Sequence, residues 1–176
     1  MNTRAVLEGP VRQIGYLVRD LDSAMHQWCA MGVGPWFTMR NLEQRDCLYR
    51  GEPCETTISI ALANSGPMQI ELIQQHDDTP SIYREFLDAK IEGYHQLAWW
   101  VTDFDAMMQK ATDAGWPVVW SGLGGDVKFV YFELEPRIST VVEVMELNDL
   151  TRGLAELLAS AADTWDGVTD LVRSLL

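Results

Sequence analysis

The sequence predicts an α+β fold in which two tandem βαβββ modules form a pseudo-two-fold curved sheet around a cavity, followed by a C-terminal helical tail. The main observation is an internal repeat, because residues 13–36 match residues 96–119 without a gap. In each copy an apolar strand runs into a short acidic turn, a helix follows, and a glycine ends that helix. A second similarity links residues 69–72 with residues 141–144 near the end of each copy. The alternative is chance similarity between two strand–turn–helix segments.

The first module, with a loose N-terminal leader, is placed at residues 1–78. Apolar periodicity indicates its helix and strands, and glycine, proline and polar turn residues separate them. The predicted elements are a strand at about 11–18, a helix at about 21–31, and strands at 36–40, 56–63 and 68–74. Residues 41–54 are polar and contain Gly51 and Pro53, so we expect a loop there.

A linker at residues 79–92 joins this module to the second one at residues 93–148, and Pro80 is placed to begin a short helix within the linker. The predicted elements of the second module are a strand at 94–101, a helix at about 104–114, and strands beginning near 117 and spanning 127–134 and 140–147. The glycines at 122–125 lie between strands, with no helix after them to bind a phosphate, so we expect a hairpin or lid loop.

The last segment, residues 149–176, has the apolar spacing of an amphipathic helix, interrupted at Asp166 and Gly167. We expect this helical tail to pack on the outside of the sheet or against a second subunit. The sequence offers no reason to give it a role at a cofactor.

Charge and cysteine content limit the partners and the location. The chain of 176 residues has a net charge of −13, whereas a nucleic acid or an anionic membrane needs a positive surface, so we expect neither partner. Cys29, Cys47 and Cys54 are odd in number and lack metal-ligand spacing, which argues against a disulfide framework and favours a cytoplasmic location. We also expect no signal peptide and no membrane-spanning segment.

Four polar residues occupy corresponding positions on strands of the two modules. They are Gln13, Glu71, Gln96 and Glu143. Alternation along each strand directs them away from the aliphatic residues that suit a helix-covered core, and therefore toward a cavity inside the curved sheet. A carboxylate among Val, Ile and Met needs a partner, so the four residues form either a ligand or catalytic site, or a buried hydrogen-bonded network that only fixes the fold.

Aromatic residues make up much of the expected cavity wall. Trp100 and Tyr131 share the face of the polar residues, and Trp36 and Phe37 are expected at the rim of the first module. Such a lining predicts a flat, apolar, cyclic ligand with one or two polar oxygens. Several of these side chains could instead belong to the core.

The motifs QIGYLVRDLDSAM, MGVGPWF, MQIELIQ, SIYREFLD, GYHQLAWWVTDFDAM and VVEVMEL together resemble the vicinal-oxygen-chelate superfamily, over roughly residues 10–147. This superfamily includes glyoxalase I, methylmalonyl-CoA epimerase, extradiol dioxygenases and bleomycin-resistance proteins, and the resemblance is closest to its epimerase-like and glyoxalase-like branch. The resemblance implies a divalent metal bound by a His on the first strand of each module and a Glu or Gln on the last. The matching positions here are Gln13, Glu71, Gln96 and Glu143.

This chain departs from that pattern because glutamine replaces both histidines. A set of two Gln and two Glu lacks the imidazole that suits Zn, Ni, Fe or Co, although an all-oxygen site for Mn, Mg or Ca stays open. His95 is next to Gln96, but alternation directs it to the other face. We therefore expect a pocket without metal or other cofactor.

A pocket without metal or other cofactor can still catalyse proton transfer. Glu71 and Glu143, with pKa values raised by an apolar cavity, can act as general acid and base. Gln13 and Gln96 can donate hydrogen bonds to a carbonyl or enolate oxygen. Glu55 is a further catalytic candidate, because it lies near the position that resembles the catalytic glutamate of the epimerases; the alternative is a solvated residue at a strand start.

The expected protein is thus a cytoplasmic homodimer that acts as a metal-independent isomerase, epimerase, cyclase or lyase on an apolar, cyclic carbonyl metabolite. One alternative is a non-catalytic protein that sequesters a hydrophobic small molecule, as bleomycin-resistance proteins do. Another is a divalent-metal-dependent epimerase with a rearranged ligand set.

Overall fold

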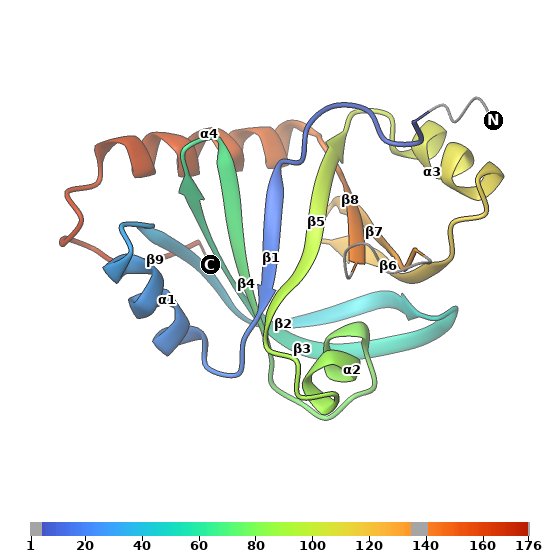
Figure 1. Cartoon of the computed structure of the whole chain (residues 1–176), viewed down its shortest axis with the longest axis horizontal. Coiled ribbons are helices and arrows are strands. Elements are labelled where there is room, and N and C mark those ends of the chain that lie inside the picture. The colour runs from blue at the N-terminus through green and yellow to red at the C-terminus, as the bar shows by residue number, and fades with distance from the viewer. Residues whose placement is uncertain (1–4, 135–140, 176) are drawn as a thin grey trace.

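The internal repeat forms two βαβββ modules in the computed structural model, which describes residues 5–134 and 141–175 (Figure 1). The first module contains β1 (Gln13–Leu17), α1 (Leu21–Ala30), β2 (Trp36–Tyr49), β3 (Glu52–Ser65) and β4 (Met68–Gln75). The second contains β5 (Gly93–Val101), α3 (Phe104–Asp113), β6 (Val118–Gly124), β7 (Val127–Phe132) and β8 (Val141–Glu146). The predicted fold class is confirmed.

The acidic turns of the repeat act as helix caps. The Asp20 carboxylate accepts a hydrogen bond from the backbone N–H of Ser23 at the start of α1, and Asp103 accepts one from Ala106 at the start of α3. Each satisfies a backbone donor that would otherwise lack a partner in the first turn of the helix. The repeated aspartate therefore fixes where each strand gives way to its helix.

Three elements lie outside the modules. The linker contains α2 (Ile82–Asp88), capped by Ser81, and the tail contains α4 (Asp149–Thr164) and β9 (Val172–Ser174). Figure 1 shows α4 running across one end of the curved sheet. The helical tail and its interruption near position 166 are confirmed.

Within the described ranges, nine strands form one sheet in the order β3-β4-β1-β5-β8-β7-β6-β2-β9. Antiparallel pairing of β1 with β5 joins the modules, and β2 pairs with both β3 and β6, so eight strands close into a barrel-like ring. Both modules of this ring belong to one chain. The short β9 extends the sheet by pairing in parallel with the start of β2.

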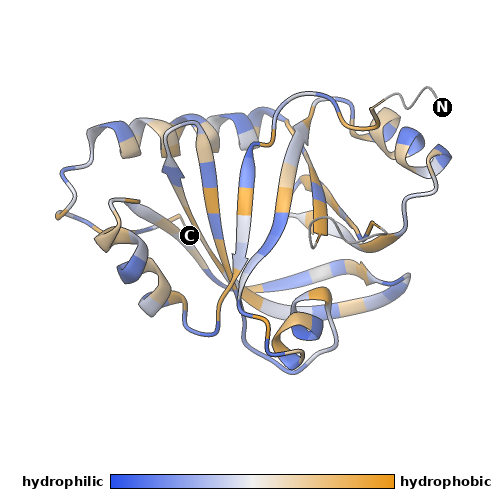
Figure 2. Cartoon of the chain, in the orientation of Figure 1, coloured by the Kyte–Doolittle hydropathy of each residue, from blue (hydrophilic) through white to orange (hydrophobic). Residues whose placement is uncertain are grey.

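The strands divide their side chains between two faces, as their alternation predicts. On the outer face α1 covers Ile70 and Leu72, whereas α3 covers Val142 and Val144. Figure 2 shows the resulting alternation of hydrophobic and hydrophilic bands along the central strands. The inner face of the sheet surrounds the cavity.

One predicted loop is strand in the structure. Residues 41–54 are mostly part of the long β2–β3 hairpin, which turns at Arg50 and Gly51, both with positive φ. Their polar side chains were misleading, because this hairpin exposes much of its outer face to solvent. The hairpin predicted at the glycines of residues 122–125 is confirmed, because β6 ends at Gly124, a turn follows at Gly125 and Asp126, and β7 pairs back antiparallel. Within β6, Gly122 leaves room for the Cys47 sulfur of the neighbouring β2.

The last strands of the second module match the prediction closely, although β7 ends at Phe132. Position 140, where the following strand was expected to begin, lies outside the described residues, as do residues 1–4 of the leader. No helix within 5–134 or 141–175 combines the length and apolar character needed to cross a bilayer.

Candidate functional site

The inner face of the ring encloses a cavity of about 450 Å³. Its lining is mainly apolar, with side chains from both modules that include Met39, Leu42, Ile60, Leu62, Phe129 and Met145. Several polar side chains of the wall come from strands β4, β1, β8 and β7, namely Gln13, Gln69, Glu71, Glu143 and Tyr131, whereas Glu43 and Gln44 come from β2 and Thr151 from α4. An apolar cavity with a few convergent polar groups is the usual form of a small-molecule site.

The four residues selected by the repeat are all buried. Gln96 is 0% exposed and Gln13, Glu71 and Glu143 are at most 8% exposed. They come from the four central strands, because β1 pairs with β4 and β5, and β5 pairs with β8. The inward orientation expected from strand alternation is confirmed, and three of the four meet directly.

Gln96 lies at the centre of a polar group that it forms with Glu71, Glu143 and Tyr131. Its Nε2 donates to Glu71 Oε2 at 2.9 Å, to Glu143 Oε2 at 3.4 Å and toward the Tyr131 hydroxyl at 3.2 Å. Its Oε1 accepts from His95 Nδ1, which leaves the amide nitrogen facing the two acids. One amide group therefore joins the carboxyl groups of both modules.

Gly15 makes this position of Gln96 available. The two residues are direct partners across β1 and β5, and the Gln96 amide lies over the glycine. A Cβ atom at position 15 would overlap the end of the glutamine side chain. The glycine is thus needed for close approach rather than for a turn.

Gln13, the counterpart of Gln96 in the repeat, has a different partner. Its Nε2 donates to Gln69 Oε1 at 2.8 Å across β1 and β4. The corresponding partner of Gln96 on β8 is Val141, which offers no polar group, so Gln96 bonds to the carboxyl groups instead. The buried Oε1 of Gln13 has no hydrogen-bond partner among the described residues.

Burial changes the protonation of the two acids. Burial raises the pKa of Glu71 to about 7, although the hydrogen bond from Gln96 lowers it in part. The pKa of Glu143 is raised well above its ordinary value, by burial first and by repulsion from Glu71 second. The pair therefore retains a proton near neutral pH, as the sharing of one site by two carboxyl groups requires.

Two tyrosines extend this hydrogen-bonded group. Tyr131 of β7 and Tyr83 of α2 are buried, and their hydroxyl oxygens are 3.3 Å apart. Burial raises the pKa of both hydroxyls well above the ordinary value, so both stay protonated and can donate hydrogen bonds. Sequence reasoning missed Tyr83; the signal was its spacing of three residues from Phe86 on the buried face of α2.

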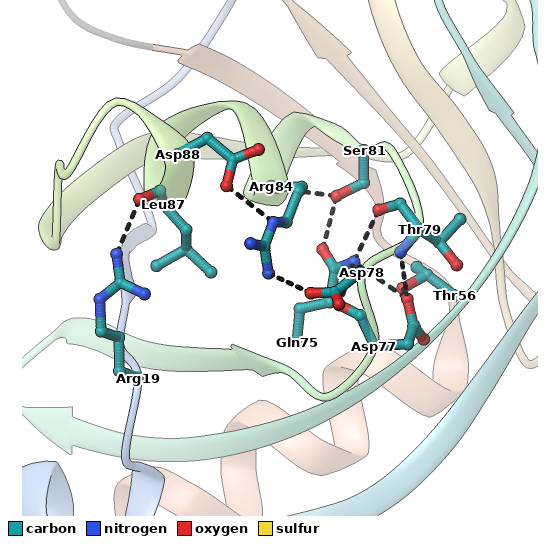
Figure 3. Close-up of polar contacts among 10 residues, drawn as sticks. All are labelled: Arg19, Thr56, Gln75, Asp77, Asp78, Thr79, Ser81, Arg84, Leu87 and Asp88. Carbon is teal, nitrogen blue, oxygen red and sulfur yellow. Dashed lines mark hydrogen bonds and ion pairs between the residues drawn. The ribbon is translucent and has the colours of Figure 1, made fainter.

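Polar contacts within the linker hold α2 in place (Figure 3). The buried Gln75 side chain accepts from the Ser81 hydroxyl at 2.6 Å and donates to the carbonyl oxygen of Thr79 at 2.8 Å. The Asp77 carboxylate accepts from the backbone N–H of Thr79 at 2.9 Å. This turn positions the first turn of α2, and with it Tyr83, against the cavity.

A family model described as the Glyoxalase/Bleomycin resistance protein/Dioxygenase superfamily matches residues 12–132. The chain belongs to this superfamily. The matched range contains Gln13, Glu71 and Gln96 and ends before Glu143. No curated protein matches the chain.

Solved structures show the same fold at low sequence identity. The hypothetical protein BH1468 from Bacillus halodurans C-125 is 17% identical, with a TM-score of 0.59 over 80% of this chain and 95% of that chain. A variant of Streptomyces coelicolor methylmalonyl-CoA epimerase in complex with 2-nitronate-propionyl-CoA is 19% identical, with a TM-score of 0.59 over 80% and 95%. Methylmalonyl-CoA epimerase from Mycobacterium tuberculosis is 20% identical, with a TM-score of 0.57 over 87% and 97%.

The metal that the superfamily resemblance implies does not fit the side chains as they are arranged. Neither glutamine supplies an imidazole, and Gln96 directs N–H groups, not its carbonyl oxygen, at the two carboxyl groups. No three His, Cys, Asp or Glu side chains converge as a metal site in the described part of the superfamily fold. A cation at this position would have to displace the amide hydrogens of Gln96.

Three of the predicted site residues lie away from the cavity. Trp36 is fully buried against α1 in the outer core, and Phe37 packs beneath α4 beside Leu158, so the expectation of a rim position is wrong for both. Glu55 is exposed on β3, because the inward positions there belong to its neighbours Cys54 and Thr56. Trp100 and Tyr131, in contrast, line the cavity as expected.

The helical tail takes part in the site, which the sequence did not indicate. Thr151 and Leu154 of α4 line the cavity, and Leu158 packs on the inner face of the first module. An amphipathic pattern shows that a helix covers an apolar surface but not which surface it covers. In this superfamily member the covered surface includes part of the cavity wall.

Proposed function

We propose that this protein is a metal-independent enzyme of the isomerase type, which moves protons on an apolar, cyclic carbonyl compound. Glu71 and Glu143 act as the general base and acid. The hydroxyl of Tyr131, which lines the cavity, stabilises the charge that develops on the substrate oxygen, and the Gln96 amide holds the two carboxyl groups in position. Epimerisation, double-bond isomerisation, cyclisation and elimination all use this step.

The observation that carries the proposal is the buried pair of carboxyl groups joined through one amide at the wall of an apolar cavity. A base works best when its pKa lies near the working pH, and burial raises the pKa of Glu71 to about 7. The raised pKa of Glu143 keeps a proton available on the other acid. One group can thus accept a proton while the other donates one.

Unsatisfied polar atoms in the cavity wall are open to a ligand. The buried Gln13 Oε1 and Trp100 Nε1 have no hydrogen-bond partner within the described chain, and both residues line the cavity. A purely structural network usually satisfies its buried atoms, because each unmade bond costs free energy. A ligand in the cavity could pair with both atoms, whereas the Nε1 atoms of Trp36 and Trp120, which also lack a hydrogen-bond partner within the described chain, lie outside the cavity lining.

The apolar substrate class follows from the lining and the charge. The cavity is surrounded by methionine, leucine, isoleucine and aromatic side chains, and the chain has a net charge of −13. A coenzyme A thioester, the kind of ligand bound in the epimerase structures, would bring further negative charge to an acidic protein. A neutral ring system with one carbonyl group suits this cavity better.

Exchange of carbon-bound hydrogen for solvent deuterium tests the proposal directly. The probe is 2-tetralone, an apolar bicyclic ketone, incubated with the protein in deuterium oxide and followed by proton NMR. We expect Glu71→Gln to lower the protein-dependent exchange rate by about 100-fold or more, as removal of a general base does. Glu55→Gln removes an exposed carboxylate outside the cavity and should leave the rate unchanged.

Metal independence is examined in the same assay. A chelator such as EDTA should not change the rate. Equal exchange in the wild type and Glu71→Gln, or loss of exchange on chelation, would overturn the proposed mechanism. Cobalt-dependent turnover of methylmalonyl-CoA would favour a metal-dependent epimerase.

Binding without turnover is the second candidate, and the unsatisfied atoms of Gln13 and Trp100 favour it equally. A sequestering protein would bind 2-tetralone without exchange, and Glu71→Gln would not weaken that binding. Substitution of Trp100 would then reduce affinity more than substitution of either carboxylate. Fluorescence titration together with the exchange assay separates the two functions.

We also propose that the protein is a homodimer in a reducing, cytoplasmic environment. None of the three cysteines forms a disulfide within the described residues, which suits such an environment. Leu150 and Leu157 of α4 are 60% and 46% exposed, and exposed leucines on one helix can pack against a second copy. Light scattering after size-exclusion chromatography tests the assembly, and the mass of a single chain would contradict it.

A further inference from the structure

The first turn of α4 forms a wall of the cavity that begins directly after the strand of Glu143. Thr151 and Leu154 line the cavity, and Met145, near the end of β8, does so as well. Leu154 also packs with Leu158 against Leu62 of β3, which lines the cavity from the first module. The helix therefore spans the cavity from the second module to the first.

This wall is apolar although it contains a threonine. The Thr151 hydroxyl donates to the carbonyl oxygen of Glu146 at 3.1 Å and accepts from the backbone N–H of Asn148 at 2.9 Å. The Asn148 side chain in turn caps the helix by accepting from the N–H of Thr151 at 3.1 Å. The capping box uses the polar atoms of this turn, so aliphatic carbon is left for a ligand to contact.

Contacts beyond the helix fix its other end. The Trp165 ring lies against Gly34, where a Cβ atom would come within 2.8 Å of it. The chain then returns to the barrel, and β9 pairs with β2 from Trp36 to Thr38. Because both ends of α4 are attached, the position of Leu154 is set by the fold rather than by a ligand.

We infer that α4 determines ligand size at this site and that Leu154 is the residue that limits it. The family match ends at residue 132, so this wall is a feature of the chain beyond the matched range. The inference rests on the proposed function only in requiring that the cavity receives an apolar ligand. It does not require that the ligand reacts.

The size limit that Leu154 sets can be measured as the ratio of the affinities for a large and a small probe. The probes are 2-tetralone, with two fused rings, and progesterone, with four, and both are titrated by quenching of tryptophan fluorescence, for which Trp100 is a reporter in the cavity wall. Leu154→Ala should improve the affinity for progesterone relative to 2-tetralone by about tenfold. Leu154→Trp should change the ratio by a similar factor in the opposite direction.

Two controls on the same helix separate size selection from loss of packing. Leu157→Ala removes a side chain that is 46% exposed and should leave the affinity ratio unchanged. Leu158 is 1% exposed and does not line the cavity, so Leu158→Ala should destabilise the fold more than Leu154→Ala while changing the ratio less. Thermal unfolding of each variant gives the comparison.

The outcomes distinguish this inference from the catalytic proposal. The affinity ratio of progesterone to 2-tetralone should change with the size of residue 154, also in the Glu71→Gln background. That result supports Leu154 as the residue that limits ligand size, even if no deuterium exchange occurs. An unchanged ratio in both Leu154 variants overturns it, even if exchange proceeds normally. Failure of both probes to bind the wild type and the variants would also overturn it.

Discussion

Replacing Gly15 by alanine tests whether Gln96 holds the two carboxyl groups together. A Cβ atom at position 15 would overlap the Cδ, Nε2 and Oε1 atoms of Gln96, so the amide would have to move. The two residues are direct partners on paired strands, which limits relief by movement of the backbone. Gly15→Ala should therefore separate the amide from Glu71 and Glu143.

The expected loss of stability combines two effects. Adding a methyl group to a packed interior costs about 1–3 kcal/mol. Losing a hydrogen bond to a charged group costs about 1.5–3 kcal/mol. Because the displaced amide can find another partner, we expect the free energy of unfolding to fall by about 3 kcal/mol, and the Tm by roughly 6–12 °C.

Urea unfolding and a pH profile of deuterium exchange provide the assay. Donation from Gln96 lowers the pKa of both acids, so its loss should move the profile to higher pH. Gly153→Ala in α4 is the matched control, because nothing lies within 4 Å of the added carbon and alanine favours a helix by about 0.5–1 kcal/mol. A loss below about 1 kcal/mol for Gly15→Ala, with an unchanged profile, would refute this account of Gln96.

Three further predictions concern the pH dependence and the support of the site. The pKa values of Glu71 and Glu143 are raised from 4.5 in the folded protein, so the stability that these two acids contribute should be fully present below about pH 4.5 and be lost as pH rises through about 7. Urea unfolding from about pH 5 to about pH 8 should show a decrease of about 3 kcal/mol, with a weaker dependence in Glu71→Gln. Asp77→Asn should lower the free energy of unfolding by about 2 kcal/mol, because the carboxylate accepts backbone hydrogen bonds in the turn before α2; an unchanged Tm would argue against that role. Tyr83→Phe should cost about 1 kcal/mol and slow deuterium exchange by loosening Tyr131, and an unchanged exchange rate would limit Tyr83 to packing.

Much of the fold could be predicted because the repeat contains its own boundaries. Asp20 and Asp103 mark the starts of two helices, and alternation on the strands places Glu71 and Glu143 inside the ring. These are local rules that follow from the periods of strand and helix. They need no knowledge of how the modules pack together.

What could not be predicted depends on contacts between distant segments. The polar residues 41–54 resemble a loop because a hairpin exposed on one face has no continuous apolar pattern. Trp36 and Phe37 could be assigned to the core only once the positions of α1 and α4 were known. The contribution of Tyr83 likewise depends on where the linker helix lies.

Two differences between the halves place the polar group on Gln96 and not on Gln13. Gln69 lies opposite Gln13 where Val141 lies opposite Gln96, and Ala98 lies opposite Gln13 where Gly15 lies opposite Gln96. A flat ring bound against Glu71 and Glu143 would meet the two acids on one face and a mainly apolar wall of aliphatic and aromatic side chains on the other. Protons would then be delivered from a single direction. Turnover in such a cavity should yield one mirror-image form of a product, and a racemic mixture should be consumed unequally.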